Sequence, residues 1–201
     1  MSATRRRPGR PAGSDAGDTR AGLLAAARTV FSERGYAGAG IAEIVARAGV
    51  SAPVLYHHFA GKADLYRAVA ADVYDEVLGA LEAAAGSGGA FVERLDAVLA
   101  AAAELNEADP TIAGFATAMP ADLRLTADLA PVREEMGRVR AFFLALAAAC
   151  PDVPRHRRAA VADACATLIA GLSRAGAIQS SQAEFRRTVE SLRLLVRGEL
   201  F

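Results

Sequence analysis

The chain has no tryptophan and only three histidines and two cysteines among its 201 residues, and these shortages exclude several classes of protein. So few histidines and cysteines leave no metal-site spacing and little material for acid–base catalysis. The sequence also contains no glycine-rich phosphate loop and no nucleophile-elbow pattern. We therefore expect a protein that is not an enzyme and that uses no cofactor and no metal ion.

Long uncharged apolar runs are missing as well. No stretch reaches the ~18 apolar residues that indicate a membrane span. The arginine-rich start MSATRRRPGRPAG is not followed by the apolar segment of a secretory signal. These two absences predict a soluble cytoplasmic protein without a membrane partner.

The two cysteines, Cys150 and Cys165, flank an expected chain reversal at Pro151–Pro154. In an antiparallel helix pair Cys165 lies about ten residues along the second helix, roughly 15 Å away at 1.5 Å per residue. A disulfide requires a much closer approach of the two Cα atoms. We therefore expect two small buried apolar side chains rather than a redox pair or metal ligands.

Alanine is abundant, and it supplies much of the 53% hydrophobic fraction. It is also the best helix-forming residue, and no alternating β-branched run indicates a strand. The apolar residues recur at helical spacing, with glycines and prolines such as Pro120 marking the breaks. The sequence predicts an all-α protein with helices over about 19–34, 41–48, 52–59, 62–85, 90–107, 111–119, 129–150, 156–177 and 182–199.

The charges are balanced in total but unevenly distributed. Residues 1–62 hold nine Lys and Arg against four Asp and Glu, whereas the remainder holds 14 against 19. A basic head on an acidic body is typical of a protein that contacts nucleic acid with one end.

Residues 19–65 satisfy the geometric requirements of a helix-turn-helix. Two short helices are joined by a tight turn at Gly49, and Ser51 can cap a third helix that follows at once. This stretch resembles the DNA-binding domain of the TetR/AcrR family of regulators. The matching residues are Phe31, Gly35–Tyr36, Ile41, Ile44, Ala48–Ser51, Leu55–Phe59, Lys62 and Leu65.

The resemblance makes the third helix the recognition helix. Tyr56 and His57 are expected to project from it, where a phenol or an imidazole can bond a phosphate or a base edge. The alternative for the histidines is an ordinary surface position. Ala52 and Val54 lack the polar groups common in the family, but they can contact thymine methyl groups. The expected DNA-contacting residues of this region are Ser51, Ala52, Pro53, Val54, Tyr56, His57, His58 and Lys62.

The arginine-rich arm is the second DNA-related feature. The run from Arg5 to Pro11 contains a Gly-Arg-Pro core similar to that of minor-groove AT-hook peptides, so Arg7 and Arg10 are expected DNA contacts. Extended arginine-rich segments suit the narrow groove of A·T-rich DNA. The alternative is a disordered solubilising tail.

The remainder of the chain matches only the general plan of the family. That plan places a dimer interface on the last two helices, and small residues such as Ala164 and Gly171 would allow close helix approach there. An apolar stripe that includes Phe185 and Val189 follows on the final helix. We divide the chain into a flexible basic arm over 1–17, a helix-turn-helix DNA-binding domain over 18–65, and a ligand-binding and dimerisation domain over 66–201.

The family plan also implies a small-molecule cavity among the middle helices. The alternative is that the candidate side chains simply fill the core. The apolar character of the candidates favours an apolar or amphipathic ligand with few hydrogen-bonding groups. The candidate lining residues are Leu99, Phe115, Met119, Leu123, Met136, Phe143 and Thr167.

Together these features predict a homodimeric, sequence-specific transcriptional regulator of double-stranded DNA. The resemblance implies a repressor that binds a palindromic operator, because two-fold symmetry presents two heads to two half-sites. Ligand binding would shift the helix that starts at Lys62 and change the separation of the heads. The alternative is an architectural DNA-binding protein without a ligand, and the sequence does not separate repression from activation.

Overall fold

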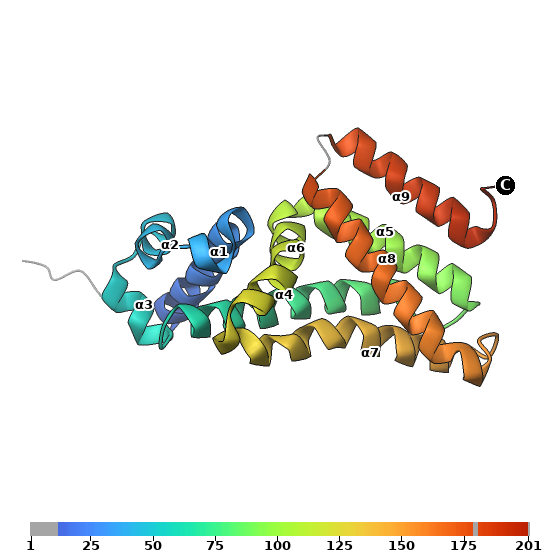
Figure 1. Ribbon diagram of the computed structural model, residues 1–201, viewed down its shortest axis with the longest axis horizontal. Coiled ribbons are helices and arrows are strands. Elements are labelled where there is room, and N and C mark those ends of the chain that lie inside the picture. Colours follow the sequence, from blue (N-terminus) through green and yellow to red (C-terminus); the bar gives the residue numbers. More distant parts are fainter. Residues whose placement is uncertain (1–11, 179–180, 201) are drawn as a thin grey trace, which may run out of the picture.

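The computed structural model describes residues 12–178 and 181–200, and all regular structure in these ranges is helical. The all-α prediction is therefore confirmed for the described part of the chain. Figure 1 shows a head at one end, a longer body of packed helices at the other, and one helix that runs from the head into the body.

The head consists of α1 (Ala12–Gly38), α2 (Ile41–Ala48) and α3 (Ala52–His58). Residues 12–17, which the sequence places in the flexible arm, are helical, so α1 begins before the expected start at residue 19. Gly35 interrupts α1 with a φ of 64° and an extended ψ of 177°, a backbone conformation that favours glycine. A further turn then leads to Gly38.

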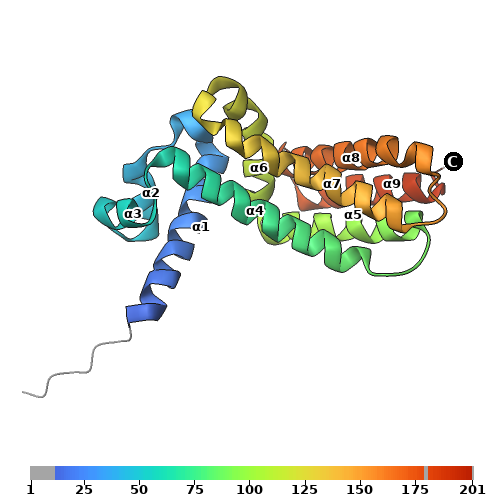
Figure 2. The ribbon, with the colours of Figure 1, turned by 90° about the horizontal axis from the view of Figure 1, so that it is seen from below.

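The body is built from α4 to α9, and its first helix belongs to both parts. α4 leaves the head next to α3 and packs against α1, α5 and α7 (Figures 1 and 2). Short 3₁₀ helices over Ala127–Val132 and Arg155–Arg157 precede α7 and α8. The body helices are α4 (Lys62–Ala85), α5 (Phe91–Ala108), α6 (Pro110–Leu125), α7 (Arg133–Ala149), α8 (Arg158–Ile178) and α9 (Gln182–Arg197).

Pro120 lies inside α6, and the expected break at this residue was wrong. A proline in a helix interior costs about 3 kcal/mol because it removes an amide donor and crowds the preceding turn. The residues that follow offset this cost. Leu123 is buried, and the carboxylate of Asp122 accepts a hydrogen bond of 3.0 Å from the hydroxyl of Tyr66.

The head and the body share one apolar core, which is centred on aromatic side chains. The ring of Tyr66 on α4 lies 4.8 Å from Phe31 on α1 and 4.9 Å from Phe115 on α6, measured between centroids. Tyr36 approaches the same tyrosine at 5.3 Å. Aromatic pairs at these distances add to the stabilisation from area burial alone. The helix-turn-helix is therefore packed directly on the body.

The contact between α1 and α6 is unusually close. A Cβ placed on Gly114 of α6 would lie 3.0 Å from the Cβ of Ser32 on α1. Beside it, Arg28 of α1 donates to Glu76 on α4, at 2.8 Å, and to Asp109, the residue that caps the start of α6. These contacts hold the start of α6 against the head.

Cys150 and Cys165 are both free and buried, as the helix spacing predicted. Burial raises the pKa of the Cys165 thiol to about 11, so this thiol is protonated and unreactive at neutral pH. Within the described residues, no group of three or more His, Cys, Asp or Glu side chains could hold a metal ion.

The segment Arg155–Ile178, which contains α8, is long and apolar enough to cross a membrane by length and composition alone. In this structure it packs against α5, α6 and α7 instead. Only 22% of its most apolar window is buried inside the chain, so one face of α8 remains uncovered.

Two glycine substitutions should test the close contact between α1 and α6. Gly79→Ala, on an exposed face of α4 with nothing within 4 Å, should stabilise the protein by about 1 kcal/mol through helix propensity. Gly114→Ala should lack this gain, because its methyl group would push α6 away from Ser32. Thermal unfolding followed by circular dichroism measures both variants, and an equal rise in Tm would show that the contact is loose.

Candidate nucleic-acid interface and ligand cavity

Helix α3 presents one face to the head core and the other to solvent. Leu55 is fully buried and Phe59 is 3% exposed, whereas Tyr56 is 55% exposed. His57 lies beside Tyr56 on the outer face, and the ring of His58 is 5.3 Å from that of His57. Figure 2 places α3 at the end of the molecule farthest from α9. The residues expected to contact DNA are therefore on an accessible helix face.

The turn between α2 and α3 positions the start of α3. Gly49 adopts the left-handed conformation, with a φ of 68°, and its amide caps the end of α2. Ser51 then precedes α3 in extended backbone, but its exposed side chain makes no capping hydrogen bond within the described residues, so the expected side-chain cap was wrong. Pro53 is exposed in the first turn of α3, and the side chains of Ala52 and Val54 are half-buried.

Lys62 has a structural function in addition to the phosphate contact that the resemblance implies. Its Nζ donates to the carbonyl oxygens of Tyr36, at 2.8 Å, and Ala39, at 3.0 Å, and it lies 4.5 Å from the Tyr36 ring. These contacts link the end of α1 to the start of α4. Because an ammonium has three donors, one remains for a phosphate. The phosphate contact stays a prediction.

Carboxylates neutralise most arginines in the described part of the head. Arg20 is the exception among them, since its guanidinium lies over the ring of Phe59, 5.4 Å from the centroid, and carries no ion pair with a described residue. Sequence reasoning missed Arg20, because only the packing of α1 against α3 places it beside the recognition helix. The paired arginines are Arg28 with Glu76 and Asp109, Arg34 with Glu43, and Arg47 with Glu33.

Arg7 and Arg10, the two arm residues expected to contact DNA, lie outside the described residues.

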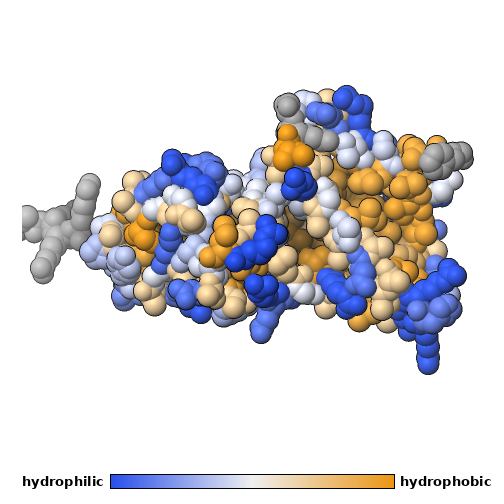
Figure 3. Space-filling model, viewed as in Figure 1, coloured by the Kyte–Doolittle hydropathy of each residue, from blue (hydrophilic) through white to orange (hydrophobic). Residues whose placement is uncertain are grey.

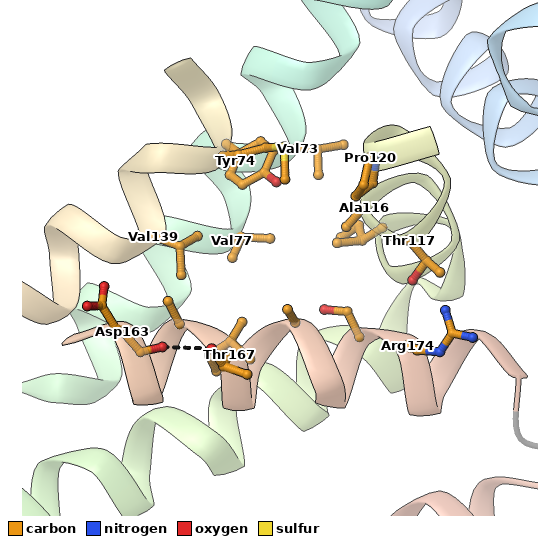
Figure 4. A pocket seen from close by; sticks show the side chains of 16 residues that line it. Val73, Tyr74, Val77, Ala116, Thr117, Pro120, Val139, Asp163, Thr167 and Arg174 are labelled. Atoms are coloured by element: carbon orange, nitrogen blue, oxygen red, sulfur yellow. Dashed lines mark hydrogen bonds between the residues drawn. The ribbon is translucent and has the colours of Figure 1, made fainter. Parts of the chain in front are cut away.

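A cavity of about 540 Å³ lies between α4, α6, α7 and α8. This volume is in the range of small-molecule sites in proteins. Figure 3 shows that the cavity opens as a hollow on the face of the body, and Figure 4 shows side chains from these helices surrounding it. Its lining consists of Val73, Tyr74, Val77, Ile112, Ala116, Thr117, Pro120, Met136, Val139, Asp163, Ala166, Thr167, Ile169, Ala170, Ser173 and Arg174.

Only Met136 and Thr167 of the seven expected lining residues are at this cavity. The other five are in the core, because α6 and α7 turn different faces to the cavity than the sequence suggested. Phe115, for example, contacts the rings of Phe31 and Tyr66 on the head side of α6. The five that do not line the cavity are Leu99, Phe115, Met119, Leu123 and Phe143, all at most 4% exposed.

Few polar groups face the cavity, and they differ in how they are satisfied. The Oγ1 atom of Thr117 is buried without a hydrogen-bond partner. Asp163 is paired with Arg140 at 2.5 Å, and the hydroxyl of Thr167 donates to the carbonyl of Asp163 at 2.8 Å. Burial and the nearby Glu135 raise the pKa of Tyr74 to about 12, so its hydroxyl is protonated at neutral pH.

The sequence signal for this site was the helical spacing of residues on α4 and α8, which share one face every three or four positions.

Residues 23–69, which include α2, α3 and the start of α4, match the family model of bacterial regulatory proteins of the tetR family. The helix-turn-helix region of this chain therefore matches the TetR family. The resemblance seen in the sequence is thereby confirmed, and this family consists of transcriptional regulators rather than enzymes.

Among curated proteins, the chain is similar to the HTH-type transcriptional activator FasR of Mycolicibacterium smegmatis, with 50% identity over 74 residues. The match spans 33% of this chain and 34% of the relative. The similarity in fold covers more of the chain than this similarity in sequence. A transcriptional regulator from Rhodococcus sp. Rha1 has a TM-score of 0.73 at 23% identity, covering 90% of this chain and 95% of that one. The TetR-family regulator SCO4454 from Streptomyces coelicolor has a TM-score of 0.70 at 23% identity, covering 92% and 97%.

Removal of the Lys62 ammonium should destabilise the protein even without DNA. Lys62→Ala should lower the free energy of unfolding by about 1–3 kcal/mol, because two carbonyl oxygens at the end of α1 lose a charged donor. Arg67→Ala removes an exposed cation from the same helix and should change the free energy of unfolding by less than about 0.5 kcal/mol. Urea unfolding followed by circular dichroism compares the two variants, and equal midpoints would refute the structural role of Lys62.

Proposed function

We propose that this protein is a homodimeric regulator that binds a palindromic operator through α3 and is released from it by a small molecule in the body cavity. The observation that carries the proposal is the position of α6. One face of this helix lines the cavity with Ile112 and Thr117, and another contacts the head through Gly114. A ligand that displaces α6 therefore acts on the helix-turn-helix through direct packing.

The outer face of α3 supplies the recognition surface. Tyr56 and His57 offer polar atoms to base edges or phosphates, and the methyl groups of Ala52 and Val54 suit contact with thymine. His58 and the exposed residues Ser51 and Pro53 complete the expected interface. With few hydrogen-bonding side chains on this helix, DNA shape and the arm contribute to specificity.

Phosphate contacts depend on a small set of cations. Arg20 and Lys62 supply the positive charge that the described head can offer to phosphates, Lys62 through its third donor. The other arginines of the described head are paired with carboxylates. The arm adds four arginines, which include Arg7 and Arg10. We infer that the arm carries a large share of the affinity, by contacts to the minor groove and the backbone.

The uncovered face of α8 supports dimerisation. Small exposed residues follow one stripe of this helix, with Ala160, Ala164 and Gly171 among them, while Ile178 and, on α9, Leu195 are 66% and 48% exposed. Figure 3 shows apolar residues gathered over the α8 and α9 end of the body. A second copy of the chain would bury this face and place two heads on one side of the dimer.

The sign of regulation depends on where the operator lies relative to its promoter. Repression is our first hypothesis, as implied by the family plan. The similar protein of Mycolicibacterium smegmatis is named an activator, so activation is the competing hypothesis. A promoter–reporter fusion measured with and without the protein decides between them. A cytoplasmic location follows from binding to chromosomal DNA.

Substitution at the uncovered face of α8 should separate the two protomers. Ala164→Glu would place a charge in the proposed interface and should yield monomers at micromolar concentration in sedimentation velocity. Ala83→Glu, at an exposed alanine on α4, is the matched control and should leave the dimer intact. A dimeric Ala164→Glu variant with an unchanged dissociation constant would place the interface elsewhere.

DNA binding should depend on the outer face of α3. On fragments that flank the gene for this protein, the wild type should form a discrete complex that survives excess non-specific competitor. Tyr56→Ala should weaken it about tenfold or more, since one good base contact contributes about 1–3 kcal/mol. Arg140→Ala, which removes a cation from α7, should leave the affinity unchanged.

A salt series on the same fragments distinguishes the alternatives. Removal of residues 1–11 should reduce the slope of log affinity against log salt, because fewer phosphate counterions are released. Complexes that competitor removes completely from every fragment would favour the architectural alternative. A complex that no small molecule weakens would contradict the ligand-released regulator.

A further inference from the structure

The cavity has one charged end that nothing within the described protein neutralises. Arg174, near the end of α8, lines the cavity, and it forms no ion pair with any described residue. Figure 4 shows its side chain at the same end of the cavity as Thr117, which projects from α6. The guanidinium therefore offers several unused donors beside the cavity.

Thr117 points to a polar ligand group at this same end. Its Oγ1 atom is buried and lacks a hydrogen-bond partner, although buried hydroxyl groups in proteins are normally paired. A ligand oxygen between the two side chains would accept from the Thr117 hydroxyl and from Arg174 together. Ser173 lines the cavity next to Arg174 and adds a third possible donor.

The rest of the cavity is unsuited to charge. Its wall on α4, α6 and α7 consists largely of apolar side chains, such as Val73, Val77 and Val139 (Figure 4). At the far end of the α8 wall, Asp163 is already neutralised by Arg140. Eleven residues separate Asp163 from Arg174, a distance of roughly 16 Å along a helix that rises 1.5 Å per residue. The cavity is thus an apolar channel with a cationic end.

We propose that the effector is an amphipathic carboxylate, whose apolar body fills the cavity while its carboxylate binds Arg174 and Thr117. This inference rests on the proposed function, since it takes the cavity as the effector site. Arg174 is exposed, so the carboxylate stays near solvent and avoids the large desolvation cost of a buried charge. A volume of 540 Å³ limits the ligand to roughly 18 water-sized groups at about 30 Å³ each.

The same geometry disfavours two other classes of ligand. A cationic amphipath would place its charge beside Arg174, where like charges repel. A neutral apolar molecule would fill the channel but leave the Thr117 hydroxyl without a partner. Selection therefore depends on the headgroup as well as on the apolar body.

Straight-chain probes of equal length test the headgroup. Dodecanoate, dodecan-1-ol and dodecylamine are titrated below their aggregation concentrations into the full-length protein without DNA, with isothermal titration calorimetry as the readout. Dodecanoate should bind one molecule per protomer, at least tenfold more tightly than the alcohol and more tightly still than the amine. Equal affinities for the carboxylate and the alcohol would overturn the proposal.

Substitutions of Arg174 and Thr117 test whether these two side chains cause the preference for the carboxylate. Arg174→Gln should weaken dodecanoate at least tenfold and leave dodecan-1-ol unchanged, whereas Thr117→Val should weaken both. Arg67→Gln, at an exposed arginine on α4 outside the cavity, is the control and should change neither. Unchanged dodecanoate affinity in Arg174→Gln would overturn the proposal, and circular dichroism verifies that each variant is folded.

A DNA-binding measurement with the same probes separates this inference from the proposed function. If dodecanoate binds with the expected preference but leaves the operator complex intact, the ligand chemistry stands and ligand release is refuted. If another class of molecule dissociates the complex while dodecanoate does not bind, the carboxylate is refuted and ligand release stands.

Discussion

The hydrogen bond between Tyr66 and Asp122 lies at the point where three helices meet, and the arrangement of head and body depends on it. The tyrosine belongs to α4, the carboxylate to α6, and Gly35 of α1 lies so close that a Cβ there would be 3.1 Å from the carboxylate. Burial and the nearby Asp122 raise the pKa of Tyr66, which keeps its hydroxyl a donor at all physiological pH values. A hydrogen bond to a charged acceptor contributes about 1.5–3 kcal/mol, and an unpaired buried carboxylate would cost more. Loss of this hydrogen bond would therefore destabilise the contact among the three helices.

In the proposed mechanism, this contact among three helices determines how ligand binding in the cavity affects the head. α6 contributes to the cavity wall, and through Gly114 and Asp122 it also contacts α1 and α4. The route from ligand to head is thus the width of one helix, about 10 Å. Because Arg28 holds the cap of α6 as well, the helix is attached to the head near both ends. A ligand that moves α6 must move the head or break these contacts.

The sequence predicted the head well because its signals are local. Gly49 adopts the left-handed conformation expected at a helix end, and the inward positions of Leu55 and Phe59 follow from helical spacing. The family resemblance was also carried by contiguous residues. Local rules were insufficient at Pro120, where burial of the following residues outweighs the cost of the proline.

The cavity could not be predicted to the same extent, for a physical reason. Helical spacing states which residues share a face, but not which neighbouring helix that face meets. Phe115 and Met119 were expected at the cavity and lie in the core instead, since their face of α6 meets the aromatic cluster. The importance of Arg174 and Arg20 is likewise a tertiary property, because it arises from the lack of an ion pair with any described residue.

In the proposed mechanism, the charge distribution of the described head would allow a small movement to release the protein from DNA. Ion pairs neutralise most arginines of the described head, so a single head holds few free cations for phosphates. In the proposed dimer, tight binding then requires both heads to dock at once, and the second docking depends on their separation. Allosteric coupling energies are typically about 1–3 kcal/mol, which changes affinity by one to two orders of magnitude. A displacement of α6 that prevents the second head from docking would reach this range without unfolding the joint at Tyr66.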